Sequence, residues 1–223
     1  MKLQEIFDQL SFGEFSQISI GGQDAGVINE CNYDRVISHI NLGLTALYTR
    51  FKLKERRLVI PLLEGVTVYP IAAEDILKVD KILADSGKEL DLNREGSEYS
   101  CFTPSLSVLQ VPQIILTPDN NVPDDLHTLN LTVVYRANHP KLSMRFGMLN
   151  ATMKTIELPS SHLMALLYFV ASRAYTPISL DTAVNTGNTW YAKYEATCQG
   201  LEDKGIQVDA MQVNTRLSRN GWV

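Results

Sequence analysis

The sequence predicts an α+β protein in which both chain ends form a helical bundle domain and a β-rich, antiparallel module is inserted between them. Apolar residues follow a helical period near the N-terminus, alternate over much of residues 55–140, and return to a helical period after residue 158. Segregated runs of helices and strands favour the α+β class over alternating α/β units. The expected parts are residues 1–54 and 151–205 for the helical domain, 55–150 for the β module, and 206–223 for an extended C-terminal tail.

Two N-terminal stretches carry the helical pattern. In residues 3–10 the apolar side chains fall on one face, and residues 32–51 repeat them at steps of three and four. Gly43 lies in the middle of the second stretch and costs about 1 kcal/mol of helix propensity relative to alanine. Such a glycine often lets another backbone approach the helix.

The middle of the chain predicts strands. Residues 56–71 are expected as a strand with Pro61 near an edge or a bend. Two strands are expected on either side of the turn at residues 85–87, whose glycine suits a positive φ. Residues 99–111 predict two short strands broken near Pro104. The next strand has one apolar face, formed by Leu129, Leu131, Val133 and Tyr135.

A closing pair of helices is expected after the β module. The stretch "LPSSHLMALLYFVASRAY" (residues 158–175) contains an uninterrupted apolar and aromatic run over residues 163–171. It is shorter than the roughly 18 residues that a membrane span needs. Pro159 suits a first helical turn, and either serine at 160–161 can cap it. A last helix is expected over residues 180–201.

Composition excludes several functional classes. Hydrophobic residues make up 45% and charged residues 20%, which predicts a packed core rather than disorder. The net charge of -5 gives no global attraction to nucleic acid. Three widely spaced cysteines, Cys31, Cys101 and Cys198, argue against a disulfide framework and suit a reducing compartment. With no signal-peptide core at the N-terminus, a soluble intracellular or assembled protein is expected.

No catalytic or metal-binding motif is present, so neither an enzyme nor a cofactor is predicted. The four histidines lack metal-ligand spacing and are expected to be surface or capping residues: His39, His127, His139 and His162. The glycine-rich residues 20–26 lack the Lys-Ser/Thr of a phosphate-binding loop. One enzymatic alternative is a small hydrolase that uses Cys31 or a histidine, with Cys31, His39 and an acidic group such as Asp34 converging in a cleft.

Two segments are candidate interaction sites. The first, here called the basic belt, comprises Arg50, Lys52, Lys54, Arg56 and Arg57. It can contact nucleic acid or an acidic protein, or it can be a solvated strand edge that discourages aggregation. The edge or a protein interface is favoured, because no aromatic residues interleave for base stacking. The second is the tail segment 213–223, whose anchor candidates are Arg216, Leu217, Arg219, Trp222 and Val223. It either docks in a partner's pocket or folds back onto its own domain.

The order of several stretches resembles the head-to-tail adaptor (connector, head-completion) proteins of tailed bacteriophages. These stretches are "LQEIFDQLSFGEFSQI", "VISHINLGLTALYTRFKLKERRLVI", "DILKVDKILADSGKELDLN" followed by "FTPSLSVLQVP" and "LTVVYRANHPKL", and "ELPSSHLMALLYFVASRAY" followed by "WYAKYEATCQGLED". The resemblance implies a structural virion protein of the neck, between capsid portal and tail. It implies a ring, typically of twelve copies, that extends the DNA channel beneath the portal and gives the tail an attachment platform.

The implied partners are further copies of the chain, the portal protein, a tail or neck protein below, and genomic DNA that passes without sequence-specific binding. No membrane partner and no catalytic residue are implied, and residues 213–223 would insert along the portal. An acidic chain suits such a channel, because basic residues would bind phosphates. A ring member also has lateral neighbours that can cover an all-apolar helix. Another neck or tail-completion protein, such as a stopper, remains an alternative.

Overall fold

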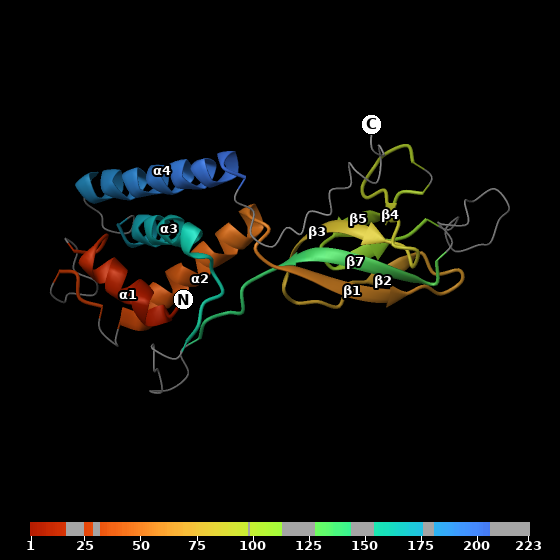
Figure 1. The fold of residues 1–223 in the computed structure, drawn as a ribbon, viewed down its shortest axis with the longest axis horizontal. Helices are drawn as coiled ribbons and strands as arrows, with labels where there is room; N and C mark the ends of the chain where they lie inside the picture. Colours follow the sequence, from red (N-terminus) through yellow and green to blue (C-terminus); the bar gives the residue numbers. More distant parts are fainter. Residues whose placement is uncertain are drawn as a thin grey trace. The chain divides into compact units, whose positions relative to one another are not determined.

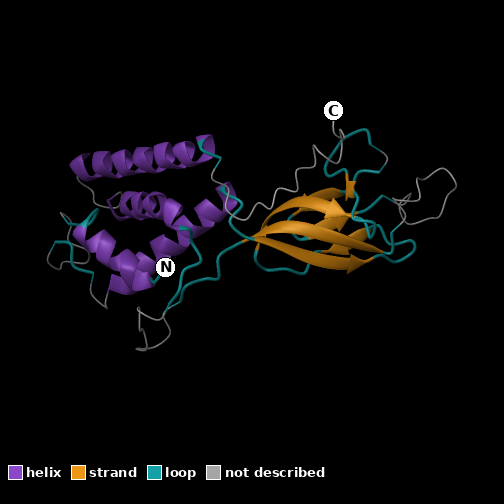
Figure 2. Cartoon of the chain, viewed as in Figure 1, coloured by secondary structure: helices purple, strands orange, loops and turns teal. Residues whose placement is uncertain are grey.

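The computed structural model describes residues 1–16, 25–28, 32–97, 99–112, 128–143, 154–175 and 181–205. The chain divides into two compact units. The helical unit comprises Met1–Gly43, Phe51–Leu53 and Ser143–Val223, and the β unit comprises Leu44–Arg50 and Lys54–Leu142. The described residues form four α-helices and two antiparallel sheets, and Figures 1 and 2 show the helices apart from the strands along the ribbon. The predicted mixture of helices and antiparallel sheets is confirmed.

The helical unit contains α1 (Leu3–Phe12), the first part of α2 (Tyr33–Arg50), a 3-10 turn η3 (Ser160–His162), α3 (Leu163–Tyr175) and α4 (Asp181–Asp203). The predicted apolar face of α1 is confirmed, since all four of its apolar positions are buried. Helix α3 packs along α4 and also contacts α1. The last turns of α2, from Leu44 onward, belong to the β unit.

Helix α3 forms the centre of the helical unit. It buries eight residues: Ala165, Leu166, Leu167, Phe169, Val170, Ala171, Ser172 and Tyr175. Opposite them lies Gly43 of α2, where an added Cβ would lie 2.7 Å from Leu166 Cδ1 and 3.0 Å from Phe169 Cδ1. The glycine therefore makes room for two side chains, not for the approach of another backbone. A larger side chain at this position would overpack the helix interface.

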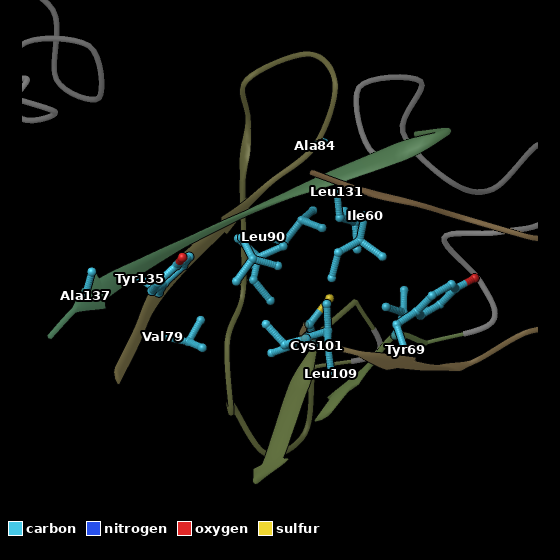
Figure 3. Packing of buried hydrophobic residues seen from close by; sticks show 14 residues of the cluster. Ile60, Tyr69, Val79, Ala84, Leu90, Cys101, Leu109, Leu131, Tyr135 and Ala137 are labelled. Atoms are coloured by element: carbon cyan, nitrogen blue, oxygen red, sulfur yellow. The ribbon is translucent and has the colours of Figure 1, made fainter. Parts of the chain in front are cut away.

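The β unit is built from two antiparallel sheets. Strands β1 (Glu55–Pro61), β7 (Asn130–Ala137), β3 (Ile76–Leu83) and β4 (Glu89–Leu90) form one sheet in this order. Strands β2 (Val68–Pro70), β6 (Val108–Gln110) and β5 (Phe102–Ser105) form the other. Figure 3 shows side chains of both sheets pointing into one shared interior, with Leu131 of β7 and Leu109 of β6 among them. Both of these leucines are fully buried.

The turn between β3 and β4 has the predicted glycine at a positive φ, with Gly87 at 80°. It is fastened to the start of β7 by Asp85, whose carboxylate accepts hydrogen bonds from the backbone N–H groups of Leu129 and Asn130, both at 3.0 Å. Burial raises the pKa of Asp85, but hydrogen bonds from Asn130, Thr128 and Leu129 outweigh it, so the pKa lies below its usual value. The ionised carboxylate thus holds the turn against the strand.

Several details of the prediction are wrong. Residues 56–71 form two strands in different sheets, because the chain turns at residues 64–65 after Pro61. The two short strands expected over residues 99–111 are present as β5 and β6, but Pro104 lies inside β5 and the break is the turn at residues 106–107. Leu129 is 78% exposed, since it precedes β7 instead of sharing its buried face.

The start of the α3 region also differs from the prediction. Pro159 itself precedes η3 and no side chain caps the turn. Ser161 Oγ instead lies 3.0 Å from His162 Nδ1. His162 and His139 are buried, not exposed or capping, because their rings pack edge-on against Phe51 and Tyr48.

Candidate interaction surfaces

The basic belt runs from the end of α2 into β1, and its side chains do not all face the same way. Arg56 and Arg57 are consecutive strand residues, so their side chains point to opposite faces of the sheet. Arg56 Nη1 lies 2.8 Å from Asp75 Oδ2, whereas Arg57 Nε is 3.9 Å from Glu55 Oε1. The ion pair at Asp75 neutralises part of the belt within the chain. A role for the belt in binding partners stays a prediction.

Beside Arg56 the β unit has an open pocket of about 510 Å³. Its apolar walls include Leu58 and Pro140, and its polar side holds the Arg56–Asp75 pair. Tyr135 donates a hydrogen bond from its hydroxyl to Asp75 Oδ1 at 3.3 Å. Burial and the nearby Asp75 carboxylate raise the pKa of Tyr135, so the phenol keeps its proton. These groups satisfy one another, which suits a recognition pocket better than a nucleophilic centre.

Sequence reasoning missed an ion pair of the β unit, between Arg136 of β7 and Asp80 of β3. Arg136 Nε donates to both carboxylate oxygens of Asp80, at 3.1 and 3.2 Å. Its Nη1 donates to the backbone carbonyls of Thr49 at 3.0 Å and Arg50 at 3.4 Å, at the C-terminus of α2. A cation is favourable there, because the carbonyls of the last helical turn lack intrahelical partners. The sequence spacing of 56 residues gives no signal for this contact.

A second polar cluster lies in the helical unit. Lys193 Nζ sits 4.0 Å from the centre of the Trp190 ring, which stacks on Tyr168 at 5.5 Å. Tyr175 donates its hydroxyl hydrogen bond to the backbone carbonyl of Glu14 at 3.0 Å. Burial raises the pKa of Glu14, although its own backbone and the Lys193 charge act in the opposite direction. The cluster joins α3, α4 and the turn after α1.

Some of the predicted site residues lie outside the described residues, namely the anchor candidates of residues 213–223, Cys31 and His127. The other histidine and cysteine candidates are described. His39 is partly buried, and burial, followed by the charges of Arg35 and Arg173, lowers its pKa. Cys101 and Cys198 are buried, and burial raises the pKa of the Cys101 thiol to about 12.

The described part of the chain contains no group of three or more His, Cys, Asp or Glu side chains that could hold a metal ion. None of its helices combines the length and apolarity of a membrane span.

Comparison with known proteins gives one family. The family described as "SU10 adaptor protein" matches residues 21–218, most of the chain. No curated protein matches the sequence. The family match supports a phage adaptor protein, which is a structural component of the virion. It points to contacts with other virion proteins and to a structural, non-enzymatic role.

Proposed function

Because the chain belongs to the SU10 adaptor protein family, we propose that it is a head-to-tail adaptor of a phage neck. Copies of the chain form a ring, typically of twelve, beneath the portal. The ring extends the DNA channel and provides the platform to which the tail attaches. The family match over residues 21–218 carries this proposal.

The helical unit supplies a surface for contacts between neighbouring copies. On α3 and α4, large apolar or aromatic side chains remain exposed: Met164 at 43%, Val184 at 37% and Tyr191 at 45%. Tyrosine is among the residues that most often anchor interfaces. Copies that meet through such a head-to-tail contact form a ring when the rotation from one copy to the next returns to the first copy.

The portal contact is assigned to the tail segment 213–223. Its arginines, Arg216 and Arg219, and its apolar residues, Leu217, Trp222 and Val223, are suitable anchors for a partner's pocket. The basic belt is assigned to a protein neighbour instead of DNA, because Arg56 is already paired with Asp75. Genomic DNA passes the ring without sequence-specific binding.

The test separates folding from assembly. Tyr191→Asp should leave the circular dichroism spectrum and the unfolding midpoint close to wild type while abolishing ring formation on purified portal, seen by electron microscopy. Leu167→Asp is the matched comparison, because Leu167 is only 2% exposed and a buried carboxylate should unfold the helical unit. Rings of normal abundance with Tyr191→Asp would show that this surface is not the lateral contact.

A second experiment separates the adaptor from the other candidate, a neck or tail-completion protein such as a stopper. The full chain is incubated with purified portal and, separately, with purified tail proteins. Retention by portal supports the adaptor role, and a chain that lacks residues 213–223 should lose this retention. Binding to tail proteins alone would favour the stopper or tail-completion role.

A further inference from the structure

Strand β1 has an open edge in the part of the chain that the structure describes. It lies at the end of the sheet order β1-β7-β3-β4, so only one of its sides is paired with a described strand. Leu62 N donates to the carbonyl of Leu129 at 2.8 Å, which shows that the even-numbered residues of β1 bond β7. The backbone N–H and C=O groups of Arg57 and Val59 therefore point away from β7, toward the open edge.

The remaining edges of the β unit are less suited to strand addition. Strands β2 and β5 form the two edges of the three-stranded sheet, and each contains a proline, Pro70 and Pro104. Strand β4 has only two residues. Proline removes a ladder donor, and short edges offer few groups for pairing. Among the described strands, β1 is thus the longest edge that an extended segment could join.

The inner face of β1 borders the open pocket of the β unit. Arg56 and Leu58 line this pocket of about 510 Å³, and Pro140 adds an apolar wall. Side chains alternate along a strand, so Arg57 and Val59 point to the opposite, outer face. A strand paired with β1 would set one of its own side chains beside Leu58, on the pocket's side of the sheet. Backbone pairing and a pocket for a side chain are therefore available at the same edge, as in peptide recognition by strand addition.

The outer face beside this edge carries positive charge. The Arg57 side chain is 66% exposed, and its distance of 3.9 Å from Glu55 makes their ion pair long. Arg57 lies opposite Val134, and Val134 lies opposite Lys81 on its other side, so the two cations share this face. Val59, on the same face, is 59% exposed. An acidic residue beside Arg57 and an apolar residue beside Val59 would complement this surface.

We propose that β1 binds an extended acidic segment of another virion protein by antiparallel strand addition. The N–H and C=O of Arg57 bond one partner residue, which is acidic, and those of Val59 bond the residue two positions before it, which is apolar. The partner residue between these two stands beside Leu58 and extends a long apolar side chain to the pocket. The recognised order is apolar, long apolar, acidic. The inference rests on the proposed function only in taking the partner to be a virion protein.

The edge fits a polypeptide better than DNA, although positive charge suits both. The outward carbonyls of Arg57 and Val59 need hydrogen-bond donors, and phosphate groups offer only acceptors. A partner strand supplies a donor and an acceptor from each paired residue. Arg56, moreover, is paired with Asp75 at 2.8 Å. The backbone groups of the edge therefore select an acidic protein segment over a phosphate backbone.

A synthetic peptide tests the proposal on the full chain. The probe is acetyl-STVLETS-amide, in which valine, leucine and glutamate follow the proposed order, and single-amide hydrogen exchange is measured by NMR. At a peptide concentration about ten times the dissociation constant, the Arg57 and Val59 amides should exchange about tenfold more slowly. The Leu58 and Ile60 amides face β7 and should keep the same protection throughout, which reports an intact sheet.

Matched controls separate strand pairing from attraction of charge. The same peptide N-methylated at its glutamate keeps its charge but lacks the donor for the Arg57 carbonyl, so it should bind at least about fivefold more weakly. Val59→Pro removes an N–H that faces the open edge and should weaken binding about fivefold, whereas Val59→Thr keeps this N–H and should not. Arg57→Glu should bind the peptide with lysine in place of glutamate about threefold more tightly than the original peptide.

Four outcomes would overturn the proposal. The first is a peptide that changes neither the Arg57 nor the Val59 amide at about 5 mM, and the second is equal binding of the N-methylated peptide. The third is protection of these amides in the free chain, which comes from a second copy if it falls on dilution and from the same chain if it does not. The fourth is protection by a DNA duplex but not by the peptide. None of these measurements requires a ring or the portal, so failure of this inference and failure of the proposed function are distinguishable.

Discussion

Breaking the ion pair of Arg136 and Asp80, two mostly buried side chains, should destabilise the β unit. Three variants test it: Arg136→Ala, Asp80→Ala and the double variant. Either single change leaves the other charge in a poorly hydrated place, because the side chains are only 20% and 14% exposed. The double variant removes both charges, so the penalty for an unpaired charge disappears.

The magnitude follows from the contacts. Breaking a fully buried pair from one side costs roughly 3–5 kcal/mol, and the partial exposure here lowers this to about 2–4 kcal/mol. Loss of the Arg136 contact with the last carbonyls of α2 adds about 0.3–1 kcal/mol. We therefore expect Arg136→Ala to lower the free energy of unfolding by about 3 kcal/mol. The double variant should be at least about 1 kcal/mol more stable than the sum of the two single changes predicts.

Urea unfolding followed by circular dichroism measures all four proteins under one condition. The slopes of the transitions must agree, since a changed slope reports a changed denatured or native state instead of a lost contact. Single costs that add to the double cost within about 0.5 kcal/mol would refute the reasoning, because they would show that the two charges do not interact.

Three other changes test the fold. Asp85 has a lowered pKa, so its contribution to the free energy of unfolding is present above its unfolded pKa and is lost as pH falls through the lower folded pKa. Asp85→Ala should remove this acid-dependent loss of stability in urea titrations below pH 4. Burial lowers the pKa of His162, so the unfolded chain takes up its proton first and stability falls as pH drops below about 6.5; His162→Phe should flatten this slope between pH 7 and 5, and an unchanged slope would contradict it. Gly43→Leu should destabilise by about 1–3 kcal/mol through overpacking, whereas Gly200→Leu, with no neighbouring atom within 4 Å of its added Cβ, should not; equal effects in thermal unfolding would refute the packing argument.

The elements with a strong period could be predicted from the sequence, and their tertiary partners could not. The apolar faces of α1 and of β7 depend on local spacing. The structure confirms every residue predicted on these two faces except Leu129. The ends of the strands were harder to predict, because Pro104 is tolerated inside the edge strand β5 and does not mark the end of that strand. The buried state of His162 depends on Phe51, which is 111 residues away in sequence and has no local signal.

The candidate interaction surfaces show the same division. The basic belt is visible as a run of charges, but its pairing is not, since Asp75 reaches Arg56 from a different part of the β unit. Arg136 looks like an ordinary outward residue of an alternating strand until the end of α2 is placed beside it. Aromatic contacts between Tyr168 and Trp190 likewise require the pairing of α3 with α4. Charge and periodicity predict candidates, and non-local packing decides what each candidate contacts.

The apolar run in α3 changes its meaning once the helical unit is described. An all-apolar helix predicts cover on every side, and neighbouring copies in a ring are one source of that cover. In the structure, eight residues of α3 are already buried within a single chain, so their apolarity requires no second copy. Only Met164 on this helix is a large apolar residue with substantial exposure, and its counterparts on α4 are Val184 and Tyr191. The case for self-association therefore rests on these exposed side chains, which is why charge at Tyr191 and charge at Leu167 should have different consequences.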